Sequence, residues 1–254
     1  MVGIGSRPIG RMRLAAAALL AALGAAAAVA AFAGISQSVA RSVQPLREAA
    51  TSPDAQRFTF DRGAWRAVAV DDVFPPVYHT LAGSAMGYAE RSYTRVGVAP
   101  AGDCRTAFDP GLTRLLSAHP CGPVLRADYT DATRTLVATV GIAVLGTRPD
   151  EERDVSAATA GQHDDLRPRA LAFPGTAAAG FADAQRVAFH ARASPGAPFL
   201  SFAAVGFSDG RSASADSGQV ALDQSGAEAA AADLGDLAGT RIELALSDMW
   251  SNRR

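Results

Sequence analysis

The longest apolar run in the chain covers residues 14–35, reads LAAAALLAALGAAAAVAAFAGI and contains no charged side chain. As an α-helix, a run of this length extends about 33 Å, which is enough to cross the roughly 30 Å hydrocarbon core of a bilayer. Arg7, Arg11 and Arg13 precede it, and no acid lies among them. The positive-inside rule therefore predicts a cytoplasmic segment 1–13, a transmembrane helix Leu14–Ile35 and an exported remainder.

The alternative interpretation of this run is a cleaved signal peptide, with Ala31–Ala33 or Ser38–Ala40 as the small-residue cleavage site. A signal peptide usually has an apolar core of about 7–15 residues, which is shorter than this run, so the pattern favours an anchor. The run is not followed by a cysteine, and a lipoprotein would therefore have no attachment point. Both interpretations export the same domain.

The segment 36–62 contains Ser, Gln, Arg and Pro and few large apolar side chains, which is typical of a stalk or linker. A folded domain is expected over residues 63–254. Its first predicted strand is Trp65–Val70, where side-chain character alternates before the prolines Pro75 and Pro76 end the pattern.

Further along, segments of period two predict strands and segments of helical period predict helices. Asp109 followed by Pro110 is a helix N-terminus signal, and His119 and Pro120 end that helix. Asp128–Arg134 and Ser194–Gly196 predict the turns of two hairpins. The predicted strands are Tyr93–Val98, Val124–Tyr129, Leu136–Leu145, Phe181–Arg192 and Phe199–Phe207. The predicted helices are Pro110–Ala118, a short one from Pro149 to about Ala160, and one from Ser225 that Gly235 and Gly239 weaken and could split.

The order strand, helix, strand, strand, helix, strand is that of a ferredoxin-like split βαβ unit. We therefore expect an α+β domain with a mainly antiparallel sheet and helices packed on it. One more strand and a C-terminal helix extend the unit, and the N-terminal transmembrane helix precedes it.

The two cysteines, Cys104 and Cys121, both lie in the exported part, where the compartment is oxidising. An even number of cysteines there favours one disulfide, which would stabilise the fold by about 3 kcal/mol in the chain-entropy model. A thiol nucleophile and a metal pair with His119 are the alternatives, and a single neighbouring histidine supports them weakly.

A few other residues could carry chemistry. Asp128 and Asp131 could hold a cation, although an aspartate in a hairpin turn usually bonds its own backbone. His119 and His163, the latter followed by two aspartates, could be metal ligands or bases, but no second ligand group stands at a defined spacing. The sequence therefore assigns no catalytic, metal-binding or cofactor-binding residue.

Charge excludes one class of partner. Three of the 24 cations precede the apolar run, so the exported part contains fewer cations than its 25 acids. A nucleic-acid-binding domain would need a basic face, and nucleic acid is not an expected partner.

Five short stretches resemble a group of uncharacterised, membrane-anchored extracytoplasmic proteins of high-GC actinobacteria. The matching stretches are Val73–Pro76, Ala107–Pro110 within the Cys104–Cys121 segment, Asp128–Thr133, Pro174–Phe181 and Gly206–Arg211. The resemblance implies an anchored envelope protein and associates it with secretion loci. Since such proteins have no assigned activity, it implies no catalytic residue.

Together these patterns predict a single-pass envelope protein whose outer domain binds another envelope protein or senses a ligand without catalysis. One alternative is an accessory subunit of a secretion system. Another is an envelope hydrolase that uses Asp128, Asp131, His119 or His163. The membrane, which the apolar run Leu14–Ile35 would cross, is the one partner that the sequence predicts directly.

Overall fold

The computed structural model describes residues 52–80, 90–118, 121–146, 155, 159, 166–194, 196–211 and 218–253. The predicted cytoplasmic segment 1–13, the predicted transmembrane helix Leu14–Ile35 and most of the predicted stalk lie outside these residues. The chain divides into two compact units, Met1–Ala55 and Gln56–Arg254, and the fold below is that of the second. Within the described ranges, no helix combines the length and the apolar character needed to cross a bilayer.

In the described residues, six strands form one sheet in the order β1-β2-β3-β4-β6-β5, and every neighbouring pair is antiparallel. The central strands β4 and β6 are buried along nearly their whole length, which accounts for their continuous apolar sequences. The strands are β1 (Val77–His79), β2 (Ser92–Val98), β3 (Cys121–Asp131), β4 (Leu136–Leu145), β5 (Arg186–Ala193) and β6 (Phe199–Phe207).

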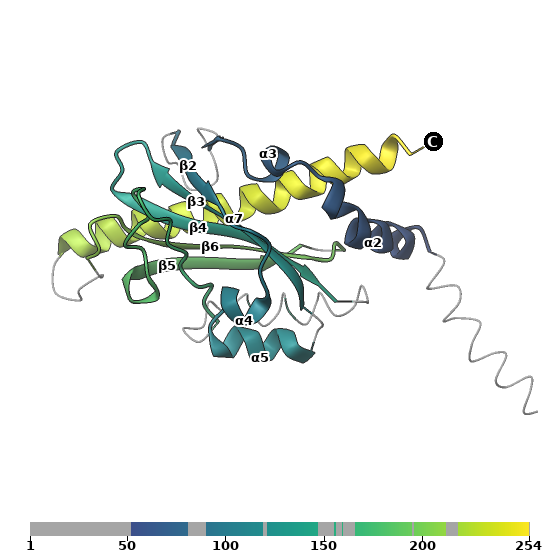
Figure 1. Ribbon diagram of the computed structural model, residues 1–254, viewed down its shortest axis with the longest axis horizontal. Coiled ribbons are helices and arrows are strands. Elements are labelled where there is room, and N and C mark those ends of the chain that lie inside the picture. Colours follow the sequence, from purple (N-terminus) through teal and green to yellow (C-terminus); the bar gives the residue numbers. More distant parts are fainter. Residues whose placement is uncertain are drawn as a thin grey trace, which may run out of the picture. The chain divides into compact units, whose positions relative to one another are not determined.

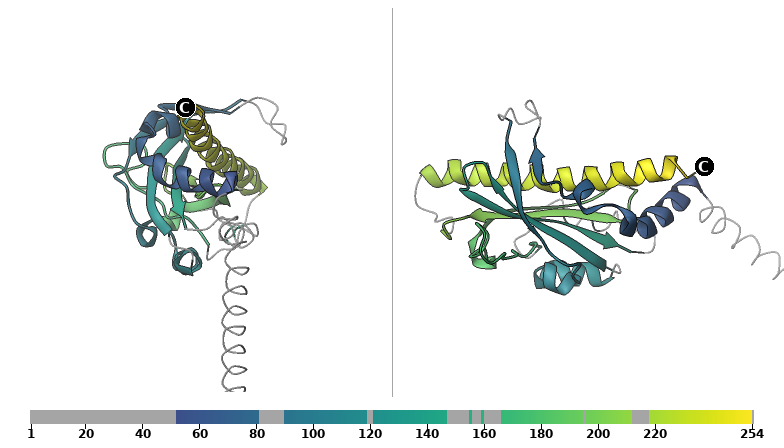
Figure 2. Two further views of the ribbon diagram at one scale, coloured as in Figure 1. Left: turned by 90° about the vertical axis from the view of Figure 1, so that its right-hand side faces the viewer. Right: turned by 45° about the horizontal axis from the view of Figure 1, so that its top comes forward.

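Helices cover both faces of this sheet. The long helix α7 (Gly218–Ser251) lies along one face, and α4 (Cys104–Ala107) and α5 (Pro110–Ala118) lie against the other (Figures 1 and 2). The chain enters the domain through α2 (Pro53–Ala64), the 3-10 turn η1 (Trp65–Ala67) and α3 (Val70–Val73). A second 3-10 turn, η2 (Asp183–Gln185), precedes β5.

Each face of the sheet has its own hydrophobic core. On one face Leu234 and Ile242 of α7 pack with Ile142 of β4. On the other face Leu112 of α5 and Phe202 of β6 belong to a second cluster. Both clusters consist of buried apolar side chains, and the removal of these side chains from water is the main favourable contribution to folding.

Two glycines in the strands let aromatic rings lie directly on the sheet face opposite α7. A Cβ atom at Gly97 of β2 would overlap the ring of Phe173, and one at Gly141 of β4 would overlap the ring of Phe202. Phe173 belongs to residues 166–182, which cover the part of this face that α4 and α5 leave open. The glycines therefore mark where the cover approaches the sheet most closely.

The structure confirms the α+β class and the antiparallel sheet with helices packed against it. The split βαβ order is wrong. In a split βαβ unit the strands before and after a helix are separated by a third strand, whereas β2 and β3 flank α4 and α5 and pair directly with each other. The first four strands therefore follow one another across the sheet, and the hairpin of β5 and β6 joins them through β6.

Two local predictions also differ from the structure. Residues 65–70 form η1 and the start of α3 instead of a strand, because the segment packs onto α7 and the core instead of pairing with a neighbour. Helix α7 continues through Gly235 and Gly239, since both glycines face the sheet, where a Cβ would crowd His190 and Ser201.

Helix α2 falls largely within the range 36–62 that the sequence assigns to a stalk. Its Phe58 is buried, and its Phe60 ring packs against the Trp250 ring at the end of α7, with 5.1 Å between the ring centroids. These contacts attach α2 to the domain. The predicted helix near residues 149–160 lies almost wholly outside the described residues, of which Val155 and Thr159 are helical.

Candidate functional site

The two cysteines of the chain are joined in the disulfide that the sequence predicts, with Cα atoms 6.3 Å apart. Cys104 begins α4, and the Asp103 carboxylate before it accepts a hydrogen bond from the Thr106 amide at 3.0 Å. Cys121 begins β3. The disulfide therefore ties the helices on one face of the sheet to the first residue of a sheet strand, and it leaves no thiol for nucleophilic or metal chemistry.

Asp131, one of the two candidate acids, holds the β3–β4 turn together. Its carboxylate accepts hydrogen bonds from the Leu136 amide at 2.8 Å and from the Thr135 and Thr133 hydroxyls. Burial raises the pKa of Asp131, but these hydrogen bonds outweigh it and hold the pKa below its usual value. The interpretation of Asp131 as a turn residue that bonds its own backbone is confirmed.

Asp128, the other candidate acid, is not in the turn but within β3, where its side chain is completely buried. Neither of its carboxylate oxygens has a hydrogen-bond partner among the described residues. Burial raises the pKa of Asp128 to about 8, against smaller opposite effects of the Thr139 hydroxyl and the Arg126 guanidinium. The carboxyl is therefore protonated at neutral pH, and with no exposed surface it cannot touch a substrate.

The two candidate acids do not meet in one site. Asp128 and Asp131 lie three residues apart on one strand, so their side chains point to opposite faces of the sheet. His119 and His163 lie outside the described residues. In the part of the chain that the structure describes, no group of three or more His, Cys, Asp or Glu side chains could hold a metal ion.

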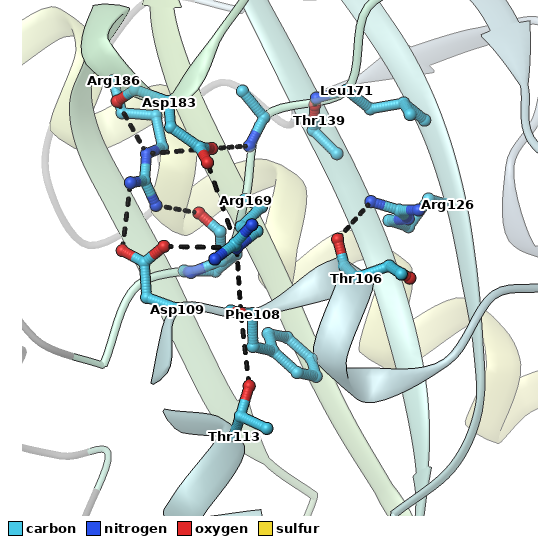
Figure 3. Close-up of polar contacts among 12 residues, drawn as sticks. Thr106, Phe108, Asp109, Thr113, Arg126, Thr139, Arg169, Leu171, Asp183 and Arg186 are labelled. Atoms are coloured by element: carbon cyan, nitrogen blue, oxygen red, sulfur yellow. Dashed lines mark hydrogen bonds and ion pairs between the residues drawn. The ribbon is translucent and has the colours of Figure 1, made fainter. Parts of the chain in front are cut away.

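A network of charged residues that the sequence gives no sign of lies beside α5 (Figure 3). Asp109, immediately before α5, pairs with Arg186 at 3.0 Å and with Arg169 at 3.5 Å, and Arg186 also pairs with Asp183 at 3.5 Å. The Arg186 guanidinium further donates to the Pro168 carbonyl at 2.6 Å. The network fastens residues 166–182 to α5 and β5, and since its charges satisfy one another we assign it a structural role.

A pocket of about 480 Å³ has a different electrostatic character. We call it the two-arginine pocket, because Arg62 at the end of α2 and Arg66 in η1 contribute its charges. Trp65 also lines it, as do Cys121 of the disulfide and Leu145 at the end of β4. The pocket therefore forms where the entry helices meet the disulfide-bonded end of the sheet.

The charges in this pocket are uncompensated. None of its described lining residues is acidic, and no described residue forms an ion pair with Arg62 or Arg66. The Arg66 guanidinium stacks over the Trp65 ring, 4.7 Å from its centroid. The indole Nε1 of Trp65 is buried, and no described residue accepts a hydrogen bond from it. Guanidinium groups without an acidic partner are groups that bind carboxylates and phosphates.

Three other pockets formed by described residues differ in this respect, because each contains an acid beside its arginine. Arg241 shares its groove with Asp72 and Asp248. Asp103 lines the pocket of Arg105 and Arg114, and Asp131 lines that of Arg134. The two-arginine pocket is therefore the best candidate for binding an anion.

Sequence reasoning missed this pocket because it placed Arg62 in a stalk and Arg66 in a strand. The one signal present was a tryptophan flanked by two arginines within five residues. No family model, curated protein or solved structure matches the chain.

Proposed function

We propose that this protein is a single-pass membrane protein whose exported domain binds an anionic ligand in the two-arginine pocket without catalysing a reaction. In this proposal Leu14–Ile35 spans the membrane, residues 1–13 stay in the cytoplasm, and the domain lies outside the cytoplasm. The apolar run and the three arginines before it support the topology. The disulfide supports the location, because such bonds persist in oxidising compartments.

The observation that carries the binding function is the pair of uncompensated arginines in one pocket. An arginine without an acidic partner attracts anions, and its planar guanidinium can bind two oxygens of a phosphate or carboxylate at once. The pocket volume of about 480 Å³ is within the usual range for small-molecule sites.

A binding role fits the remaining polar residues better than a hydrolytic one. Asp131 is engaged in a turn, and Asp128 is protonated and inaccessible. Neither can act with the other on one substrate, so nothing among the residues that the structure describes favours the hydrolase alternative. The secretion-subunit alternative stays a prediction from the sequence.

The binding proposal can be tested with the full chain in nonionic detergent. We would replace Trp250 by Phe, which leaves Trp65 as the sole tryptophan, and titrate inorganic phosphate while recording its fluorescence. We expect a saturable change that the pair Arg62→Gln and Arg66→Gln abolishes. The control is the pair Arg134→Gln and Arg211→Gln, which removes the same charge from the opposite end of the sheet, after β3 and β6. This pair should leave the titration unchanged. A titration indifferent to Arg62 and Arg66 would rule out the pocket.

A further inference from the structure

We propose that the anion bound in the two-arginine pocket is the phosphate of an anionic phospholipid in the membrane that holds the anchor. This inference rests on the proposed function and names the ligand of the same pocket. It makes the pocket the contact through which the domain lies against the membrane surface.

The length of chain before the domain allows this contact. Seventeen residues separate Ile35, at the end of the predicted span, from Pro53, at the start of α2. Such a segment reaches at most about 60 Å when extended and about 25 Å as a flexible coil. The pocket is therefore within reach of the lipid headgroups on the exported side. Its effective concentration at that surface is high, because the anchor keeps the domain there.

The residues at this end of the domain are those that favour a membrane interface. Tryptophan concentrates at the level of the headgroups, and arginine binds their phosphates. The chain has two tryptophans, and both are at α2 and its surroundings: Trp65 follows α2, and Trp250 packs on Phe60. The Arg253 guanidinium stacks on the Trp250 ring at 3.6 Å, so a cation accompanies each ring.

An exposed apolar side chain lines the groove next to the pocket. Among the described residues, Leu244 is the most exposed of the large hydrophobics, at 59%. Leu244 lines the neighbouring groove with Ala67 and Val68, which directly follow Arg66. These side chains can enter the headgroup region while the arginines hold a phosphate. Because acids also line that groove, we assign the phosphate to the two-arginine pocket and only apolar contact to its neighbour.

The test uses the full chain carrying Trp250→Phe, reconstituted through its own anchor into phosphatidylcholine nanodiscs with or without phosphatidylglycerol. The readout is quenching of Trp65 fluorescence by a lipid that carries a spin label on its headgroup. We expect stronger quenching when phosphatidylglycerol is present. Each arginine near an anionic surface contributes about fivefold to the affinity for that surface. The double variant Arg62→Gln with Arg66→Gln should therefore bind the phosphatidylglycerol surface about 25-fold more weakly. The Arg134→Gln and Arg211→Gln pair should have no such effect.

Three other results would overturn the assignment of the pocket to lipid phosphate. If the protein inserts but quenching depends neither on phosphatidylglycerol nor on Arg62 and Arg66, the lipid assignment is overturned and the anchor stands. If inorganic phosphate binds in detergent and the nanodisc signal does not respond, the pocket binds anions but the lipid assignment is again overturned. If the chain does not insert at all, the anchor itself is overturned and this inference with it.

Discussion

Asp128→Asn should make the protein more stable at neutral pH, and the gain should grow with pH. The wild-type carboxyl is completely buried, and its pKa of about 8 lies far above the usual value of 3.8. The folded protein therefore keeps this proton to a higher pH than the unfolded chain does. Unfolding releases a proton between about pH 4 and pH 8, and the free energy of unfolding falls as pH rises through this range.

The magnitude follows from the number of protons released. One proton corresponds to about 1.4 kcal/mol per pH unit, so this group lowers the free energy of unfolding by about 2.7 kcal/mol between pH 5 and pH 7. Asparagine has nearly the shape of the protonated carboxyl and does not titrate. The difference in stability between Asp128→Asn and the wild type should therefore increase by about that amount over the same interval, because other titrating groups cancel in the comparison.

The measurement is urea unfolding of both proteins in nonionic detergent at pH 5, 6 and 7, followed by tryptophan fluorescence. Asp131→Asn is the matched control, since its carboxylate is already ionised across this interval and its effect should not vary with pH. A difference between Asp128→Asn and the wild type that stays constant from pH 5 to pH 7 would refute the reasoning. It would mean that Asp128 is ionised and that the Arg126 guanidinium compensates its charge.

Three further changes test the fold. Asp131→Asn should itself lower the free energy of unfolding by about 1 kcal/mol at pH 7, because it weakens charge-assisted hydrogen bonds. This loss should disappear as pH falls through the low pKa of the carboxylate, and a pH titration of stability checks this. Replacing Cys104 and Cys121 by Ser should lower the free energy of unfolding by about 3 kcal/mol, to the value of the reduced wild type. Gly235→Ala should destabilise the protein by about 1 kcal/mol, because its Cβ would lie 2.7 Å from the His190 ring. Gly226→Ala, whose Cβ would have nothing within 4 Å, should instead stabilise α7 by up to about 1 kcal/mol. Equal effects of the two substitutions would contradict the packing of α7 on the sheet.

Sequence patterns predicted the elements whose signals are local. The β-branched run of β4 and the Asp109–Pro110 start of α5 are both where the patterns placed them. The same kind of pattern wrongly predicted a strand over residues 65–70, because a short apolar alternation fits either a strand or a turn of helix packed on a core. Packing against α7 decided between the two, and no local pattern reports that contact.

The sheet order and the site depend on residues far apart in sequence. β4 pairs with β6 instead of β5, a choice that strand patterns do not encode. The Asp109 carboxylate meets Arg186, 77 residues later, so nothing near either residue indicates the pair. Likewise, the two-arginine pocket exists only because the end of α2 lies beside the disulfide-bonded start of β3. The cysteines were the exception, since their even number and the export that the sequence predicts were sufficient to predict their bond.

The most direct test of the proposed topology is thiol labelling of the chain in fractionated cells that produce it. The intact chain, with Leu14–Ile35 still attached, should pellet with the membranes. Cys104 and Cys121 should react with an alkylating reagent only after reduction. Full-length protein in the soluble cytosolic fraction, with both cysteines alkylated without reduction, would contradict the proposed topology.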